Sequence, residues 1–111
     1  VMHSLDLKRF GPQLVKINRF YYWDKQSLVL YDKDRNPLNV KGKEITLINI
    51  FCSGNINTVF TTSQILNLVW PEMKDKTKAT VSLRATISML HKKLNAPIFE
   101  SVYNVGYKLV K

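Results

Sequence analysis

The last third of the chain joins a helical repeat directly to a hairpin pattern, and this junction constrains the fold more than any other feature. Over residues 80–94, large apolar residues recur at i, i+4, i+7 and i+11, which places them on one stripe that must face a core. They are Leu83, Ile87, Leu90 and Leu94. Pro97 breaks the helical pattern, and residues 98–110 alternate around a turn near 104–106, where Asn104 and Gly106 accept positive φ cheaply. The sequence therefore predicts a helix followed at once by a β-hairpin.

Upstream, short β-prone runs alternate with turn-forming residues. The runs are 14–17, 20–23, 27–31 and 37–40. This pattern predicts a small antiparallel sheet of about four strands. The residues before it end at Gly11-Pro12, a strong breaker. We therefore expect residues 1–13 to be a linker or a remnant of a neighbouring segment, and residues 14–111 to form one domain.

The middle of the chain changes from a period of two to a period of 3.6. A first helix is expected over 43–53, and Gly54 stands just past its end, where a left-handed residue is common. Its expected inward stripe is Ile45, Ile48 and Cys52, with Leu47 and Phe51 beside them. A second helix is expected to begin at Thr61, because Thr61 and Gln64 match a capping box, and to end at Pro71. A polar loop, 72–77, leads to the third helix.

The charge balance restricts the class of partner. There are 17 Lys and Arg residues against 8 Asp and Glu, a formal net charge of +9. Such an excess favours a polyanion, either nucleic acid or an anionic membrane surface, although it also serves solubility. A membrane binder needs an amphipathic helix with free apolar bulk, and the apolar stripe here is already committed to the core. Nucleic acid is therefore the favoured partner.

No motif in the sequence indicates a catalytic, metal-binding or nucleotide-binding site. The single cysteine, Cys52, excludes an internal disulfide and a cysteine metal cluster. The calcium-like run 32–36 has Pro37 where such a loop needs glycine, and no phosphate-binding loop, nucleophile elbow or zinc-ligand spacing is present. We expect no enzyme activity and no cofactor. The absence of a signal peptide or a run of about 20 apolar residues predicts a cytoplasmic location.

The outward face of the third helix is small and polar at its centre and cationic at its edges. Ser82, Ala85 and Ser88 are small enough to let a helix of roughly 22 Å enter a major groove about 12 Å wide. Between Lys74 and Lys93 there are six Lys and Arg residues and one acid, Asp75. As a solvated helix face this would be unremarkable, but next to a basic hairpin it indicates contact with DNA.

The order of elements and five local strings resemble the OmpR/PhoB-type winged-helix DNA-binding domain of bacterial response regulators. The strings are VKGKEITLI (40–48), VFTTSQIL (59–66), VW (69–70), ISMLHKKL (87–94) and VYNVGYKL (102–109). The resemblance runs over about 14–110, nearly the whole chain. It implies an α+β winged helix-turn-helix with an N-terminal four-stranded antiparallel sheet, three helices and a C-terminal β-hairpin wing.

The resemblance also implies roles. The third helix would read the major groove of promoter DNA, and the wing would touch the backbone or minor groove. The loop 71–78, with Trp70 at its edge, would contact RNA polymerase. Regulation would come through a receiver domain outside this sequence, by phosphorylation and homodimerisation. A membrane-anchored transcription activator with the same domain is a second possibility, and a winged helix that docks a protein is a third.

We therefore expect two sets of site residues. Expected to contact DNA are Lys78, Ser82, Arg84, Ala85, Thr86, Ser88, Met89, Lys92, Lys93, Tyr103, Asn104 and Lys108. Expected to contact polymerase are Trp70, Glu72, Lys74 and Asp75, although on composition alone Trp70 fits a core position better and only the resemblance favours the polymerase role.

The chain also departs from the family pattern. Val81, Ser88, Met89 and His91 stand where the family usually has arginines, Arg84 stands where it has an acid, and Tyr103-Asn104 replaces the common Arg-Gly of the wing. Base preference therefore cannot be borrowed from a relative. Met89 could contact a thymine methyl or another subunit, and His91 could contact phosphate or pack as a polar-tipped filler.

Overall fold

The N-terminal part of the fold is a four-stranded antiparallel sheet in the order β1-β2-β3-β4. The computed structural model describes residues 14–111, so the expectation for 1–13 lies outside the described residues. The strands are β1 (Leu14–Asn18), β2 (Tyr21–Asp24), β3 (Val29–Asp32) and β4 (Pro37–Leu38). One row across the sheet pairs Val15, Trp23, Leu30 and Leu38, and this row faces the helices. The predicted strands are confirmed to within two residues at most ends.

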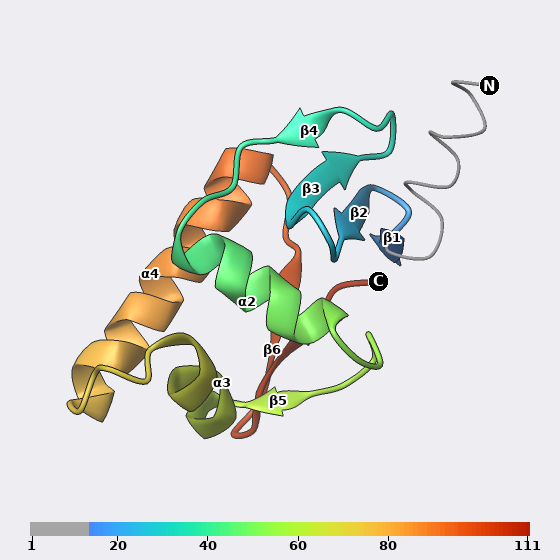
Figure 1. The fold of residues 1–111 in the computed structure, drawn as a ribbon. Helices are drawn as coiled ribbons and strands as arrows, with labels where there is room; N and C mark the ends of the chain where they lie inside the picture. The colour runs from blue at the N-terminus through green and yellow to red at the C-terminus, as the bar shows by residue number, and fades with distance from the viewer. Residues whose placement is uncertain (1–13) are drawn as a thin grey trace.

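The first helix, α2 (Lys43–Cys52), lies at the centre of the molecule, with the N-terminal sheet above it and the hairpin running behind it to a tip beside β5 and α3 (Figure 1). Its buried apolar residues are Leu47, Ile48, Phe51 and Cys52, so the inward stripe is centred away from the half-buried Ile45. The prediction that Gly54 adopts the left-handed conformation was wrong. Ser53 ends the helix in the right-handed region, and the positive φ lies at the other end, at Gly42 (φ 60°).

The second helix, α3 (Thr62–Val69), begins as predicted. The Gln64 amide donates to Thr61 Oγ1 at 3.1 Å, and the Thr61 amide donates to Gln64 Oε1 at 2.9 Å, which completes the capping box. Ile65, Leu66 and Val69 are buried against the core. The helix ends at Val69, and Trp70 is its C-cap, immediately before Pro71.

The third helix, α4 (Lys76–Leu94), starts one turn earlier than residue 80. The physical reason is a cap that the apolar pattern does not contain. The Asp75 carboxylate accepts from the amides of Thr77 at 3.0 Å and Lys78 at 3.2 Å, so it satisfies two amides that have no partner within the helix. The fully buried Ala79 extends the core stripe into this added turn. Part of the expected loop 71–78 is therefore helical.

A second sheet has the order β5-β7-β6. Its strands are β5 (Phe60–Thr61), β6 (Phe99–Val102) and β7 (Gly106–Leu109). The hairpin is confirmed, but β5 was not predicted. It attaches the hairpin to the start of α3 through the pairs Phe60–Tyr107 and Thr61–Gly106.

The hairpin turn uses its two special residues differently. Asn104 takes the left-handed conformation, with φ 58°. Gly106 does not, so the expected positive φ at Gly106 was wrong. Glycine is needed there because a Cβ would lie 1.9 Å from the Phe60 carbonyl oxygen, closer than any side chain can approach. The close approach of β7 to β5 therefore explains this residue.

Candidate nucleic-acid interface

The outward face of α4 carries no acidic side chain. Its core stripe is confirmed, with Leu83 and Leu90 fully buried and Ile87 8% exposed, whereas Leu94 is only partly buried. Opposite this stripe and on its two flanks, seven of the predicted DNA contacts are exposed: Lys78, Arg84, Ala85, Ser88, Met89, Lys92 and Lys93. Val81 is exposed beside them. The helix therefore presents a long surface of small, apolar and cationic groups.

Two predicted contacts on α4 are partly withdrawn from solvent. Ser82 and Thr86 are half-buried, and the Thr86 hydroxyl donates to the Ser82 carbonyl at 2.8 Å. The Thr86 hydroxyl proton is thus used within the helix. Both side chains lie at the edge of the exposed face rather than at its centre.

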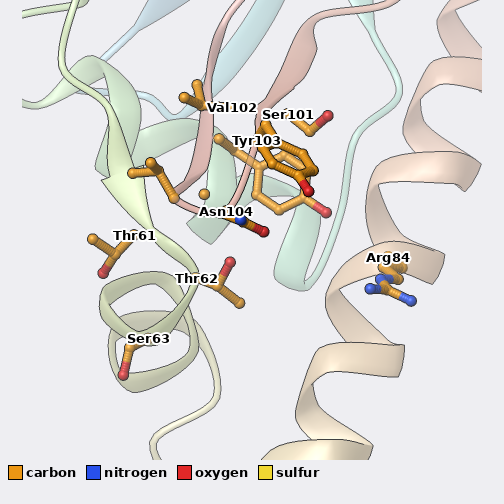
Figure 2. A pocket seen from close by; sticks show the side chains of 11 residues that line it. Thr61, Thr62, Ser63, Arg84, Ser101, Val102, Tyr103 and Asn104 are labelled. Carbon is orange, nitrogen blue, oxygen red and sulfur yellow. The ribbon is translucent and has the colours of Figure 1, made fainter.

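A groove of about 680 Å³ separates Arg84 from the hairpin tip. Figure 2 shows Tyr103 and Asn104 of the tip on one side, Arg84 of α4 on the other, and the first residues of α3 nearby. The groove is lined in part by Thr61, Thr62, Ser63 and Ser101, which the sequence analysis did not select. Their hydroxyls are suited to anionic groups such as phosphate. The first amides of α3 contribute less, because the Thr62 amide donates to the Val105 carbonyl at 3.2 Å and the Gln64 amide donates to Thr61 Oγ1. The capping box at Thr61 was the available signal for this surface.

The hairpin tip is the most exposed part of the site. Tyr103 is 88% exposed and Asn104 is exposed beside it, as expected for contacts with a large partner. Lys108 is half-buried, and its ammonium lies 3.3 Å from Glu100 on the paired strand. The tip and α4 thus form the two sides of one concave surface.

The C-terminal end of α4 is fixed by its side chains to the rest of the fold. Lys93 Nζ lies 2.8 Å from Glu44 Oε1, and this oxygen also accepts from the Lys41 amide at 3.1 Å. The side chains of Lys93 and Glu44 are 28% and 10% exposed. Lys93 therefore joins α4 to the start of α2. Its neighbour Lys92 points outward and has no acidic partner among residues 14–111.

His91 joins the same end of α4 to the hairpin. Its Nε2 accepts from the Phe99 amide at 3.1 Å, and its ring stacks on the Phe99 ring. Nε2 is an acceptor only when it carries no proton. Burial lowers the pKa of His91 below its usual value. The packed interpretation of His91 agrees with these contacts.

The turn between α3 and α4 holds the residues expected to contact polymerase. Trp70 is 5% exposed and belongs to the core, so it offers little surface to a partner. Glu72 is exposed and lies 3.2 Å from Lys43 Nζ, which also donates to the Val69 carbonyl at 2.7 Å. Asp75 caps α4, and Lys74 is exposed.

Other kinds of site are not found in the described part of the chain. Residues 14–111 contain no group of three or more potential metal ligands. No helix in the same range is long and apolar enough to cross a membrane. Burial raises the pKa of the Cys52 thiol to about 12, so this thiol is not a ready nucleophile.

An N-terminal sheet, three helices and a hairpin beside the last helix define the winged-helix class of DNA-binding domains. Residues 35–109 match the family model described as "Transcriptional regulatory protein, C terminal", and the chain belongs to this family of DNA-binding transcription regulators. No curated protein sequence matches the chain.

Solved structures agree in fold. The DNA-binding domain of the response regulator AdeR, crystallised with an intercistronic region, is 21% identical, with a TM-score of 0.67 over 89% of this chain and 99% of that one. The DNA-binding domain of CpxR from E. coli is 17% identical, with a TM-score of 0.68 over 88% and 96%. The Thermotoga maritima response regulator DrrB is 15% identical, with a TM-score of 0.68 over 99% of this chain and 52% of that one.

Proposed function

We propose that this domain binds promoter DNA sequence-specifically as the effector domain of a two-component response regulator. The helix α4 would lie in the major groove, and the β6–β7 wing would lie on the backbone or minor groove. The observation that carries the proposal is the outward face of α4, which has cations around a small-residue centre and no acid. It shares a groove with an exposed wing tip, so both can reach one duplex.

The residues have two roles in this proposal. Those facing bases are Ser82, Arg84, Ala85, Ser88 and Met89. Those holding phosphates and setting the register are Lys78, Thr86, Lys92, Tyr103, Asn104 and Lys108. Lys93, first expected among the phosphate contacts, is assigned to holding α4 against α2, because Glu44 already engages its ammonium.

The first experiment is equilibrium binding to a random duplex and to duplexes selected from a random pool, each across a salt series. We expect clearly tighter binding to selected sites and a steep loss of affinity with salt, since phosphate contacts release counterions. Lys92→Glu should weaken binding, whereas Lys16→Glu, an equal charge change on the exposed edge of β1, should weaken it much less. Absence of binding even at low salt would overturn the proposal and favour α4 as a protein-docking surface.

RNA polymerase contact through the α3–α4 turn is a separable part of the proposal. The exposed side chains of Glu72 and Lys74 support it, with Trp70 anchoring the turn from below. Lys74→Glu should reduce activated transcription in a purified system while promoter affinity stays unchanged. Unchanged transcription would remove Lys74 from this role.

Homodimer formation on DNA, through a receiver domain in the same protein, completes the proposal. The likeness to DrrB, a response regulator in which this domain occupies about half the chain, supports it. A cytoplasmic location accords with this role, and a membrane-anchored activator is the alternative. Sedimentation of the full-length protein with duplexes carrying one or two selected half-sites tests the stoichiometry, and one copy on two half-sites would contradict a dimer.

A further inference from the structure

An apolar ridge runs along the outward face of α4. Val81, Ala85 and Met89 are spaced at i, i+4 and i+8, so they follow one line along the helix. Val81 is 61% exposed and Met89 is 64% exposed, and Ala85 is exposed between them. The ridge lies opposite the buried Leu83 and Leu90, so it does not contribute to the core.

The surroundings of the ridge indicate its partner. Scattered exposed apolar residues are ordinary, but these three share a line that is flanked by Lys78, Arg84 and Lys92, on a helix without an acid. An apolar protein or lipid surface would have to desolvate those cations. The major groove of DNA offers phosphates at its edges and, inside, one apolar group on the base edges, the C5-methyl of thymine.

The outward face of α4 has few groups that can read guanine. Arginine is the common bidentate reader of guanine, and α4 has only one, Arg84. Arg84 lies toward the groove that α4 shares with the wing tip. Met89 can adapt to an irregular apolar contact because its side chain is unbranched and flexible, whereas Val81 is stiff.

We infer that Val81, Ala85 and Met89 read thymine methyl groups, so that the preferred half-site is rich in thymine where α4 lies. Val81 and Met89 are about 12 Å apart along the helix axis. At about 3.4 Å of rise for each base-pair step along the duplex axis, this length spans at most three to four steps, and fewer when the helix is inclined to that axis. The inference rests on the proposed function, and it adds the class of base sequence that the domain recognises.

Deoxyuridine provides the test, because it lacks only the methyl group of thymidine. Duplexes are selected from a random pool with the intact domain, and the best binder is remade with deoxyuridine replacing each thymidine in turn. We expect thymine at several adjacent positions, and a loss of affinity of about threefold to fivefold for each methyl that the ridge contacts. Thymines outside the half-site serve as internal controls.

Variants assign the effect to the ridge. For the one thymine that each side chain contacts, Met89→Ala and Val81→Ala should each bind the thymidine duplex and the deoxyuridine duplex with nearly equal affinity. The affinity for the deoxyuridine duplex itself should change little. This double-mutant comparison removes any effect of uracil on the duplex itself. Leu28→Ala, an exposed apolar truncation in the β2–β3 turn, should leave the preference for thymidine intact.

The outcomes separate the two claims. Specific binding with equal affinity for thymidine and deoxyuridine duplexes would overturn the methyl readout and leave the proposed function standing. A selected half-site of guanine and cytosine pairs would do the same. Failure to bind any duplex would overturn the proposed function itself.

Discussion

Lys92 and Lys93 are neighbours with the same chemistry, and both reach solvent, but within residues 14–111 only Lys93 is paired with an acid. Lys92 is exposed on the outward face of α4, whereas the Lys93 ammonium lies 2.8 Å from a carboxylate that is only 10% exposed. Met89 and Leu90 differ in burial, at 64% and 0% exposure. Each pair differs by one step of about 100° around the helix. The comparison shows that the stability of α4 and its contact with a partner are carried by separate, interleaved residues.

The largest expected effect is a loss of stability when the buried face of α4 is changed. Leu90→Ala should lower the free energy of unfolding by about 2–5 kcal/mol, because it leaves a cavity in the core. Met89→Ala, one residue away, should change it by less than about 0.5 kcal/mol. Urea unfolding of both variants measures the difference. Similar losses would mean that Met89 packs inside the protein and that the two faces are not separate.

The next prediction compares the contributions of Lys92 and Lys93 to the free energy of unfolding. Lys93→Gln should lower the free energy of unfolding by about 1–3 kcal/mol, since it removes a charged hydrogen bond from the poorly exposed Glu44. Lys92→Gln should leave stability within about 0.5 kcal/mol of the parent. Urea unfolding at neutral pH measures both. Equal stability of the two variants would contradict a structural role for the Lys93–Glu44 pair.

In DNA binding the order should be the opposite: Lys92→Gln should have the larger effect and Lys93→Gln the smaller one. Lys92→Gln should reduce the slope of log affinity against log salt by about 1, as expected for the loss of one phosphate contact. Lys93→Gln should leave the slope nearly unchanged, provided that it is measured where the variant is folded. Fluorescence anisotropy with one selected duplex measures both slopes. A reduced slope for Lys93→Gln alone would return Lys93 to the DNA surface.

The smallest effect concerns His91. Because the folded pKa of His91 is lowered, the unfolded chain takes up the proton first as the pH falls below about 6.5. The contribution of His91 to stability is thus complete above that pH and decreases below it, until the folded form is also protonated. Urea midpoints of the parent and His91→Gln between pH 7.5 and pH 5 should converge as the pH falls. Parallel curves would show that the bond from the Phe99 amide does not depend on the proton.

Local signals predicted the parts of the fold that short segments determine. The capping box at Thr61 was confirmed because both partners lie within one turn. The stripe of Leu83, Ile87 and Leu90 was confirmed because a helical period is visible in the sequence itself. The start of α4 was predicted too late, because the apolar pattern weakens there and the Asp75 cap was not weighed against it.

Contacts between distant segments could not be predicted in the same way. The pairing of β5 with β7, the need for glycine at residue 106 and the Lys93–Glu44 pair all join segments separated by whole helices. None of these leaves a periodic trace in the sequence. The exposed residues of α4 were found by elimination from the core stripe, but their actual contacts with DNA bases remain predictions.

The pairing of β5 with β7 has a consequence for chain entropy. The two strands close a loop that contains α3, the α3–α4 turn and α4, so the whole helix pair is an insertion within one strand pairing. The closure entropy of a long loop rises slowly, by about 0.6 kcal/mol for each doubling of its length. A few residues added between Pro71 and Lys74 would therefore lengthen a loop that is already long, at little thermodynamic cost. The turn proposed to contact polymerase can thus vary in length while the strands β5 and β7 keep their register.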